Sequence, residues 1–380
     1  MEFDLGPDRT VLRDSAREFL ARECTLEFAR RHDEAETFPH QLYCSIAALG
    51  WLGLPFYAAC GGHTGDEVDE AVIVEQLGYA MMPLAACYLV TVLTCGKTIR
   101  DIGSDGQRRT WLPRIASGDA YLSYGLTEPS AGSDAARVAT RAQRTSAGWL
   151  VNGQKMFCAG ADMASAMVLI ARTGDSASGS DGLSTFLFDP AAPGVTITPL
   201  SALGMRPYRT CAVRLDNVEL PAEALLGEEN RAWHYLTTSL NRERIAAAAM
   251  CTGTAQAALD AAVEYAKGRQ QFGVPIGTFQ AIRHRLADAH VRIHQARLLT
   301  YRAAWLEANG QPSALAASMA KLWASEAAVD VAGAGMRVLG GYSYLLDHPM
   351  QRYLRDSLMS PIGAGTNELQ RDIIAKELKL

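Results

Sequence analysis

The spacing of apolar residues changes twice along the chain. Up to about residue 118, apolar side chains recur every three or four positions, as across 11–24, and this period predicts helices. From 119 to 228, short apolar runs alternate with turn-forming clusters such as Asn152-Gly153, which predicts β-strands. From 229 onward the helical period returns in long, alanine-rich segments.

These patterns define the expected fold. In the last part, the breaks at glycine and proline predict helices over about 231–268, 278–309 and 313–339, and a final helix from near Asn367. We therefore expect a mainly α protein with a central β domain: an N-terminal α-helical domain (1–118), a middle antiparallel β domain (119–228) and a C-terminal four-helix bundle (229–380).

Composition narrows the class of protein. The 36 basic and 41 acidic residues give a net charge of −5, which argues against an electrostatic grip on nucleic acid or anionic lipid. The eight cysteines form no CxxC pair and no zinc-ligand spacing, as expected for thiols in a reducing compartment. No secretory signal is visible, and the longest apolar run, 85–93, is too short to span a bilayer. We expect a cytoplasmic enzyme.

The stretch Tyr124–Asp134 joins the first helical part to the β-rich part. Pro129 interrupts regular structure there, and the hydroxyls of Thr127, Ser130 and Ser133 lie beside free backbone N–H groups. Such a loop can hold a polar ligand. On composition alone, an ordinary polar connector is the favoured interpretation.

Two short patterns are typical of other enzyme classes. His290 and His294 lie one helical turn apart, as metal ligands can, but interleaved arginines would repel a cation, so we expect no metal site. Ser318 and Lys321 match the S-x-x-K pattern of serine nucleophiles, yet the motifs that accompany it are missing. We interpret this pair as part of a helix surface.

Glu243 is a candidate general base. It precedes the nearly uncharged run 246–258, so it can mark the boundary between a solvated turn and a packed interior. A carboxylate shielded from water has a raised pKa and can accept a proton near neutral pH. From spacing alone, a surface ion pair is the favoured interpretation.

Four separated blocks, in order and spacing, resemble the acyl-CoA dehydrogenase family across essentially the whole chain. They are Tyr124–Asp134; Asn152-Gly153-Gln154-Lys155 with Leu203-Gly204-Met205-Arg206; Arg269-Gln270-Gln271-Phe272-Gly273 with Phe279-Gln280; and Leu339-Gly340-Gly341 with Arg355-Asp356 and Gly365-Thr366-Asn367-Glu368. The family's fold has the same three parts as the fold expected from periodicity.

The resemblance implies bound FAD and oxidation of an acyl thioester between Cα and Cβ. A base removes the α proton while hydride passes from Cβ to flavin N5. The thioester carbonyl is held by a flavin ribityl hydroxyl and a backbone N–H, here that of Ala364. The resemblance also implies a homotetramer, and an electron-transfer flavoprotein or oxygen as electron acceptor.

Site residues carried over from the family fall into four groups, and Ser133 belongs to two of them. Asn241 and Arg244, together with Ser133, are expected to contact the substrate. The cofactor is expected to be bound by the remainder: Leu126, Thr127, Ser133, Phe157 and Ala159 at the isoalloxazine; Arg269, Gln271, Phe272, Gln280, Arg337, Gly340 and Gly341 at the tail of an FAD shared with a neighbouring subunit; and Thr366 and Glu368 from the FAD's own subunit.

Three departures from the family pattern affect these expectations. Many members carry the catalytic glutamate directly before Gly-Thr, where this chain has Ala364; isovaleryl-CoA and long-chain acyl-CoA dehydrogenases instead carry it on a helix, in a pair like Glu243-Arg244. This favours Glu243 as the base. Ala159 lacks the hydroxyl that usually faces flavin N5, and Arg337 replaces a glutamine.

Other functions fit the same resemblance. Some family members from biosynthetic pathways act on acyl or aminoacyl groups held on a carrier protein. A flavin-binding homologue without dehydrogenase activity, or a flavin monooxygenase on the same fold, is a further alternative. The acyl chain cannot be identified, because pocket volume does not follow from sequence position.

Overall fold

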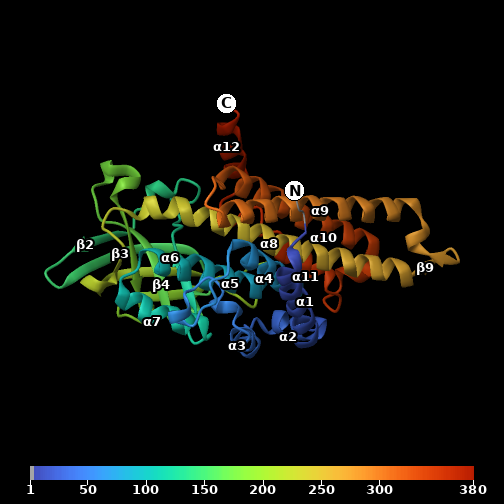
Figure 1. Ribbon diagram of the computed structural model, residues 1–380, viewed down its shortest axis with the longest axis horizontal. Coiled ribbons are helices and arrows are strands. Elements are labelled where there is room, and N and C mark those ends of the chain that lie inside the picture. Colours follow the sequence, from blue (N-terminus) through green and yellow to red (C-terminus); the bar gives the residue numbers. More distant parts are fainter. Residues whose placement is uncertain (1–3) are drawn as a thin grey trace.

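The computed structural model describes residues 4–380, apart from the side chains of 176–178. The strands of the large sheet gather at one end of an elongated molecule, and long C-terminal helices run from them to the short β9 hairpin at the other end (Figure 1). The first part is helical, as predicted. Its elements are α1 (Gly6–Glu23), α2 (Leu26–Ala35), α3 (His40–Ala48), α4 (Glu67–Ala80), α5 (Met82–Tyr88), the π-helical η3 (Leu89–Gly96), α6 (Lys97–Ile102) and α7 (Asp105–Ala116).

Side-chain caps fix where two of these helices begin. Asp66 accepts hydrogen bonds from the first turn of α4, and the Asp66 N–H in turn donates to the Asp69 carboxylate. Ser104 and Gln107 form the same reciprocal box at the start of α7. Each box satisfies N–H groups that a helix leaves without an intrahelical acceptor.

The helices α5, η3 and α6 join into one stretch, Met82–Ile102, that is long and apolar enough to cross a membrane. By itself, the uninterrupted apolar run 85–93 is too short to span a bilayer, as the sequence indicated. The helical stretch is longer than that run because it also includes polar residues. Within the fold, 89% of the most apolar window is buried. The stretch therefore has the surroundings of a core helix.

The strands join into one sheet in the order β6-β7-β3-β2-β4-β5-β8, with β1 beside β4. Most pairs are antiparallel, but β1 and β2 run parallel to β4, so the sheet is mixed rather than wholly antiparallel. A parallel pair needs a long connection, and the β2–β3 hairpin lies within the one between β1 and β4. The bounds are β1 (Leu122–Gly125), β2 (Arg141–Arg144), β3 (Gly148–Ala159), β4 (Ala166–Arg172), β5 (Leu183–Phe188), β6 (Val195–Pro199), β7 (Thr210–Pro221) and β8 (Leu225–Leu226).

Three long helices dominate the C-terminal part, with bounds within about two residues of those predicted. α8 packs against α4, α9 and α10. Helices α4 and α8 cross so closely that a Cβ on Gly253 would lie 2.0 Å from the carbonyl oxygen of Glu75. The elements are α8 (Ala232–Gly268), the β9 (Gln270–Gln271) and β10 (Val274–Pro275) hairpin, α9 (Gln280–Ala308), α10 (Ala314–Leu339), α11 (Met350–Ser357) and α12 (Asn367–Glu377).

Candidate active site

Glu243 lies on α8, and its side chain is partly buried. Its carboxylate has no hydrogen bond and no ion pair with any described residue. Burial raises the pKa of Glu243, and the positive charges of Arg244 and Lys321 partly oppose this rise. A carboxylate without a partner, and with a raised pKa, is equipped to accept a proton.

Three elements meet around this carboxylate. Burial raises the pKa of Cys95, on η3, and of Tyr124, on β1, and in both cases the negative charge of Glu243 adds to the rise. Both helix η3 and strand β1 therefore lie near Glu243. A π-helical segment is uncommon and is often found at functional sites.

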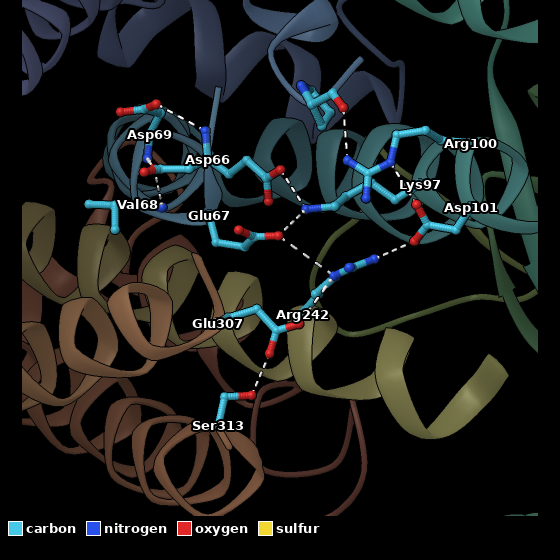
Figure 2. Close-up of polar contacts among 12 residues, drawn as sticks. Asp66, Glu67, Val68, Asp69, Lys97, Arg100, Asp101, Arg242, Glu307 and Ser313 are labelled. Atoms are coloured by element: carbon cyan, nitrogen blue, oxygen red, sulfur yellow. Dashed lines mark hydrogen bonds and ion pairs between the residues drawn. The ribbon is translucent and has the colours of Figure 1, made fainter. Parts of the chain in front are cut away.

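The residue before Glu243 ties α8 to the N-terminal helices (Figure 2). Arg242 pairs with Asp101 at 2.5 Å, with Glu307 at 3.3 Å and with Glu67 at 3.7 Å. Lys97, almost fully buried, joins the same cluster through Glu67 at 2.9 Å and Glu70 at 2.6 Å. The members of this charged cluster come from α4, α6, α8 and α9. The cluster therefore fixes the turn of α8 that carries Glu243.

The residue after Glu243 is oriented by a polar chain that leads to the same charged cluster. Arg244 Nη1 donates to Asn241 Oδ1 at 2.9 Å, and Asn241 Nδ2 donates to Ser313 Oγ at 3.4 Å. Ser313 in turn donates to Glu307. The Nε of Arg244 is buried and has no acceptor among the described residues. Asn241 and Arg244, both predicted to contact substrate, are thus brought together, with one N–H free.

The loop before α12 presents a free backbone donor. Ala364 has φ of +52° and the following Gly365 has +78°, both in the left-handed region. The N–H groups of Ile362 and Gly363 bond to Met359, whereas that of Ala364 has no acceptor in the described part of the chain. Gln370 Nε2 donates to the Gly365 carbonyl at 3.1 Å and so steadies the turn.

The predicted flavin-contacting loop follows β1 directly. The backbone carbonyl of Thr127 accepts a hydrogen bond from the Met156 N–H at 2.8 Å, and that of Leu126 accepts one from Lys155 Nζ at 3.0 Å. Lys155 also donates to Glu128 at 2.7 Å, and the two side chains are 0% and 4% exposed. This buried ion pair holds the loop against β3. Burial lowers the pKa of Lys155 to about 8, and the Glu128 carboxylate opposes that shift.

Phe157 projects from β3 beside this loop. It has φ of +60°, rare for an aromatic residue, and its side chain is 65% exposed. Ser133 is exposed, and Ala159 is partly buried with its carbonyl accepting from Ser123 Oγ at 2.9 Å. The left-handed backbone at Phe157 thus holds a large aromatic side chain in the open.

The residues predicted at the FAD tail form a separate cleft of about 510 Å³. It lies between the β9–β10 hairpin at the end of α8 and the end of α10. Glu243 and Arg269 are 26 positions apart on or next to α8, about 39 Å along the helix axis. The predicted residues that line the cleft are Arg269, Gln271, Phe272, Arg337, Gly340 and Gly341.

The other predicted cofactor residues lie outside this cleft. Gln280 is the first residue of α9 and is exposed. Thr366 caps α12, with its hydroxyl accepting from the Leu369 N–H, and Glu368 is exposed in the first turn of that helix. Both helix starts present N–H groups and partial positive charge, which suit an anionic group.

One interpretation made from the sequence is wrong. Ser318 and Lys321 do not lie on a helix surface: they are 0% and 1% exposed, between α10 and its neighbours. The sequence signal was a lysine within an otherwise apolar, alanine-rich segment. Arg242 and Lys155 were likewise not selected as site residues, because pattern alone does not show which charges are buried.

Comparison with known proteins identifies the class of protein. Three family models match in sequence order: acyl-CoA dehydrogenase N-terminal domain at residues 6–119, middle domain at 123–218 and C-terminal domain at 230–379. The chain belongs to the acyl-CoA dehydrogenase family. This confirms the resemblance and the three-part fold expected from the sequence.

Individual relatives cover the whole chain. A probable acyl-CoA dehydrogenase of Bacillus subtilis is 36% identical over 379 residues, 100% of both chains. The solved structure of butyryl-CoA dehydrogenase from Megasphaera elsdenii has a TM-score of 0.95 at 31% identity and covers 100% of both chains. That of a prolyl acyl carrier protein oxidase has a TM-score of 0.94 at 30% identity, covering 99% of this chain and 100% of the other.

Proposed function

We propose that this chain is an FAD-dependent dehydrogenase that oxidises an acyl thioester between Cα and Cβ, with Glu243 as the base. The observation that carries the proposal is the Glu243 carboxylate, which is partly buried, unpaired and has a raised pKa. Bound FAD supplies the hydride acceptor for this reaction. The chain's own residues supply proton removal, carbonyl stabilisation and the shape of the site.

The thioester carbonyl needs donors, because the α proton becomes acidic only when the charge developing on oxygen is stabilised. The N–H of Ala364 supports this role, since it has no acceptor within the described chain. Arg244 and Asn241 flank the base and are proposed to orient the substrate. The Nε of Arg244 is buried and unpaired among the described residues, which is costly for a charged group, so an acceptor on the substrate would stabilise it.

The residues present fit FAD. Loop residues Leu126 and Thr127, held by Lys155, together with the exposed Phe157, Ser133 and Ala159, would hold the isoalloxazine. Arg269 and Arg337 give the 510 Å³ cleft two guanidinium groups, which suit a diphosphate. Around Gly340 and Gly341 no atom lies within 4 Å of where a Cβ would be, so a ligand can approach the backbone.

The 510 Å³ cleft, here called the tail cleft, lies far from Glu243 within one chain. This distance supports an FAD shared between subunits and hence an oligomer. We propose a homotetramer in the cytoplasm, with Gln271, Phe272 and Gln280 reaching the FAD of a neighbour and Thr366 and Glu368 binding the FAD of their own subunit. The reduced enzyme would pass electrons to an electron-transfer flavoprotein or to oxygen.

The thioester carrier is either CoA or a carrier protein, and a cleft at the start of α8 favours CoA. It has a volume of about 320 Å³, and its walls include Arg231, Trp233 and His234 as well as the acidic Asp181. Arg231 lies 12 residues before Glu243, or about 18 Å along the helix, a distance that a long pantetheine arm can cover. An aromatic side chain beside basic groups suits a nucleotide bearing phosphates.

Anaerobic absorption spectroscopy tests the proposal, with acyl-CoA and carrier-bound acyl thioesters added one at a time to wild type and to Glu243→Gln. Wild type is expected to lose its flavin absorption band with at least one thioester. Glu243→Gln is expected to keep FAD but lose at least about 100-fold in reduction rate, because no group then accepts the proton. Equal rates in the two proteins would exclude Glu243 as the base.

A further inference from the structure

Lys321 is a buried cation that the proposed reaction does not use. It lies on α10 and is 1% exposed. Its ammonium donates to Asn367 Oδ1 at 2.8 Å and to the Pro361 carbonyl at 3.4 Å. A lysine in an apolar interior is costly, so its retention there calls for a reason.

The two acceptors of Lys321 are the two ends of one loop. Pro361 begins the segment that carries Ala364, and Asn367 ends it at the start of α12. The Asn367 N–H donates back to the Pro361 carbonyl at 2.9 Å, which closes the loop, and Ser325 Oγ donates to Asn367 Oδ1 at 3.0 Å. One buried ammonium therefore holds both ends of the strained turn at Ala364 and Gly365.

We propose that Lys321 is a positioning residue that aims the Ala364 N–H at the thioester carbonyl by fixing the ends of the 361–367 loop. The inference rests on the proposed function, because it assigns Lys321 a role through Ala364. Lys321 itself touches neither the substrate nor the flavin in this account. The S-x-x-K pattern thus has a use unrelated to a serine nucleophile.

The charges around Lys321 support this role. Glu243 and Arg244 face it from α8, as does the Cys251 thiol, and Glu368 faces it from α12. Burial lowers the pKa of Lys321 to about 8, and the nearby Cys251, Glu368 and Glu243 groups act against that shift. The same ammonium opposes the rise in the pKa of Glu243. One side chain thus influences both the pKa of the proposed base and the position of the proposed carbonyl donor.

Lys321→Met tests the inference, because methionine keeps the apolar length but removes the donors. With a thioester that wild type oxidises, we expect kcat to fall about 10- to 100-fold, less than the loss of a whole donor gives, with a smaller change in KM. Lys321→Arg keeps charge and donors and should recover part of the loss. Ser318→Ala, one turn away on the same helix and without a contact to the loop, should match wild type.

A second readout does not depend on turnover. A 3-thia acyl thioester has an acidified α proton, and its enolate gives a long-wavelength absorption band against the flavin. The apparent pKa of enolate formation should rise by about one to two units in Lys321→Met, which corresponds to 10- to 100-fold weaker stabilisation. A merely structural lysine would lower the melting temperature and leave this value unchanged.

The outcomes separate the two proposals. If wild type reduces its flavin with a thioester while Lys321→Met matches it in kcat and in enolate pKa, the positioning role is wrong and the proposed function stands. If wild type oxidises none of the thioesters, the proposed function itself fails. Should Lys321→Met not fold, Asn367→Ala removes the acceptor instead and is expected to give the same fall in kcat and rise in enolate pKa.

Discussion

At the scale of single residues, the site depends on groups that are left without partners. The Glu243 carboxylate, the Ala364 N–H and the Arg244 Nε all lack an acceptor or donor in the part of the chain that the structure describes. Buried polar groups are normally paired, so three unpaired groups on neighbouring elements are best explained by a ligand that completes them. The stability of the free protein should reflect this arrangement.

Glu243→Gln should stabilise the protein at neutral pH. The pKa of Glu243 is raised in the folded state, so the folded protein holds its proton more tightly than the unfolded chain does. Stability from this group is complete at pH values below its ordinary pKa and is lost as pH rises through the raised folded value. Glutamine does not titrate and avoids that loss.

The measurement is the difference in unfolding free energy between Glu243→Gln and wild type across pH. The difference should be smallest near pH 4 and grow with pH to a plateau, by about 1.4 kcal/mol for each unit by which the pKa is raised. A difference that shrinks as pH rises would show that the carboxylate is paired in solution.

At the scale of elements, the charged cluster around Arg242 joins helices from both ends of the chain. Arg242 and its partners Glu67 and Glu307 are each less than a fifth exposed. Removing one member of a buried ion cluster leaves opposite charges without compensation, and this costs more than the pair itself contributes.

Arg242→Met should therefore lower the free energy of unfolding by about 3 kcal/mol. Arg214→Met is the matched control, because Arg214 and its partner Asp216 are 73% and 57% exposed, and it should cost less than about 1 kcal/mol. Denaturant unfolding of both variants measures the difference. Equal costs would mean that the cluster is effectively solvated.

The elements also show what periodicity can and cannot predict. The long helices were predicted nearly to the residue, since their apolar stripe and flanking glycines carry the signal locally. Strand β1 and its parallel pairing with β4 were missed, because a four-residue strand has too few positions to show a period. The burial of Lys321 was missed for a different reason: burial depends on what packs over a residue.

The candidate site was predictable only through its motifs. Glu243 was singled out from its place before an uncharged run, and its unpaired state became visible only with neighbours from three other elements. The residues that support the site, Arg242, Lys155 and Lys321, carry no motif of their own. They pair with partners 27 to 175 positions away in sequence, and such pairs leave no local pattern.

At the scale of the whole molecule, we propose that FAD binding and assembly depend on each other, because the cleft around Arg337 lies far from Glu243 within one chain. Arg337→Ala should weaken FAD binding about tenfold, because it removes one cation from a diphosphate site. Arg302→Ala, exposed on α9 and not part of the cleft, is the control. FAD retained after gel filtration measures binding, and light scattering measures mass.

The wild-type mass should be roughly 164 kDa, four times the 41.0 kDa of one chain, as closed symmetric assemblies are the rule among oligomers. FAD loss from Arg337→Ala is expected to occur together with partial dissociation. A monomer that retains FAD at full occupancy would contradict the shared site.

Helix α8 runs unbroken from Ala232 to Gly268, from the cleft proposed for CoA, past Glu243, to the hairpin beside the cleft proposed for the FAD tail. Each residue of an α-helix turns the chain by about 100°. An inserted or deleted residue between Glu243 and Arg269 would rotate one functional region away from its partners while leaving the other in place. Evolution can therefore exchange residues along this helix, but it cannot change the helix's length one codon at a time.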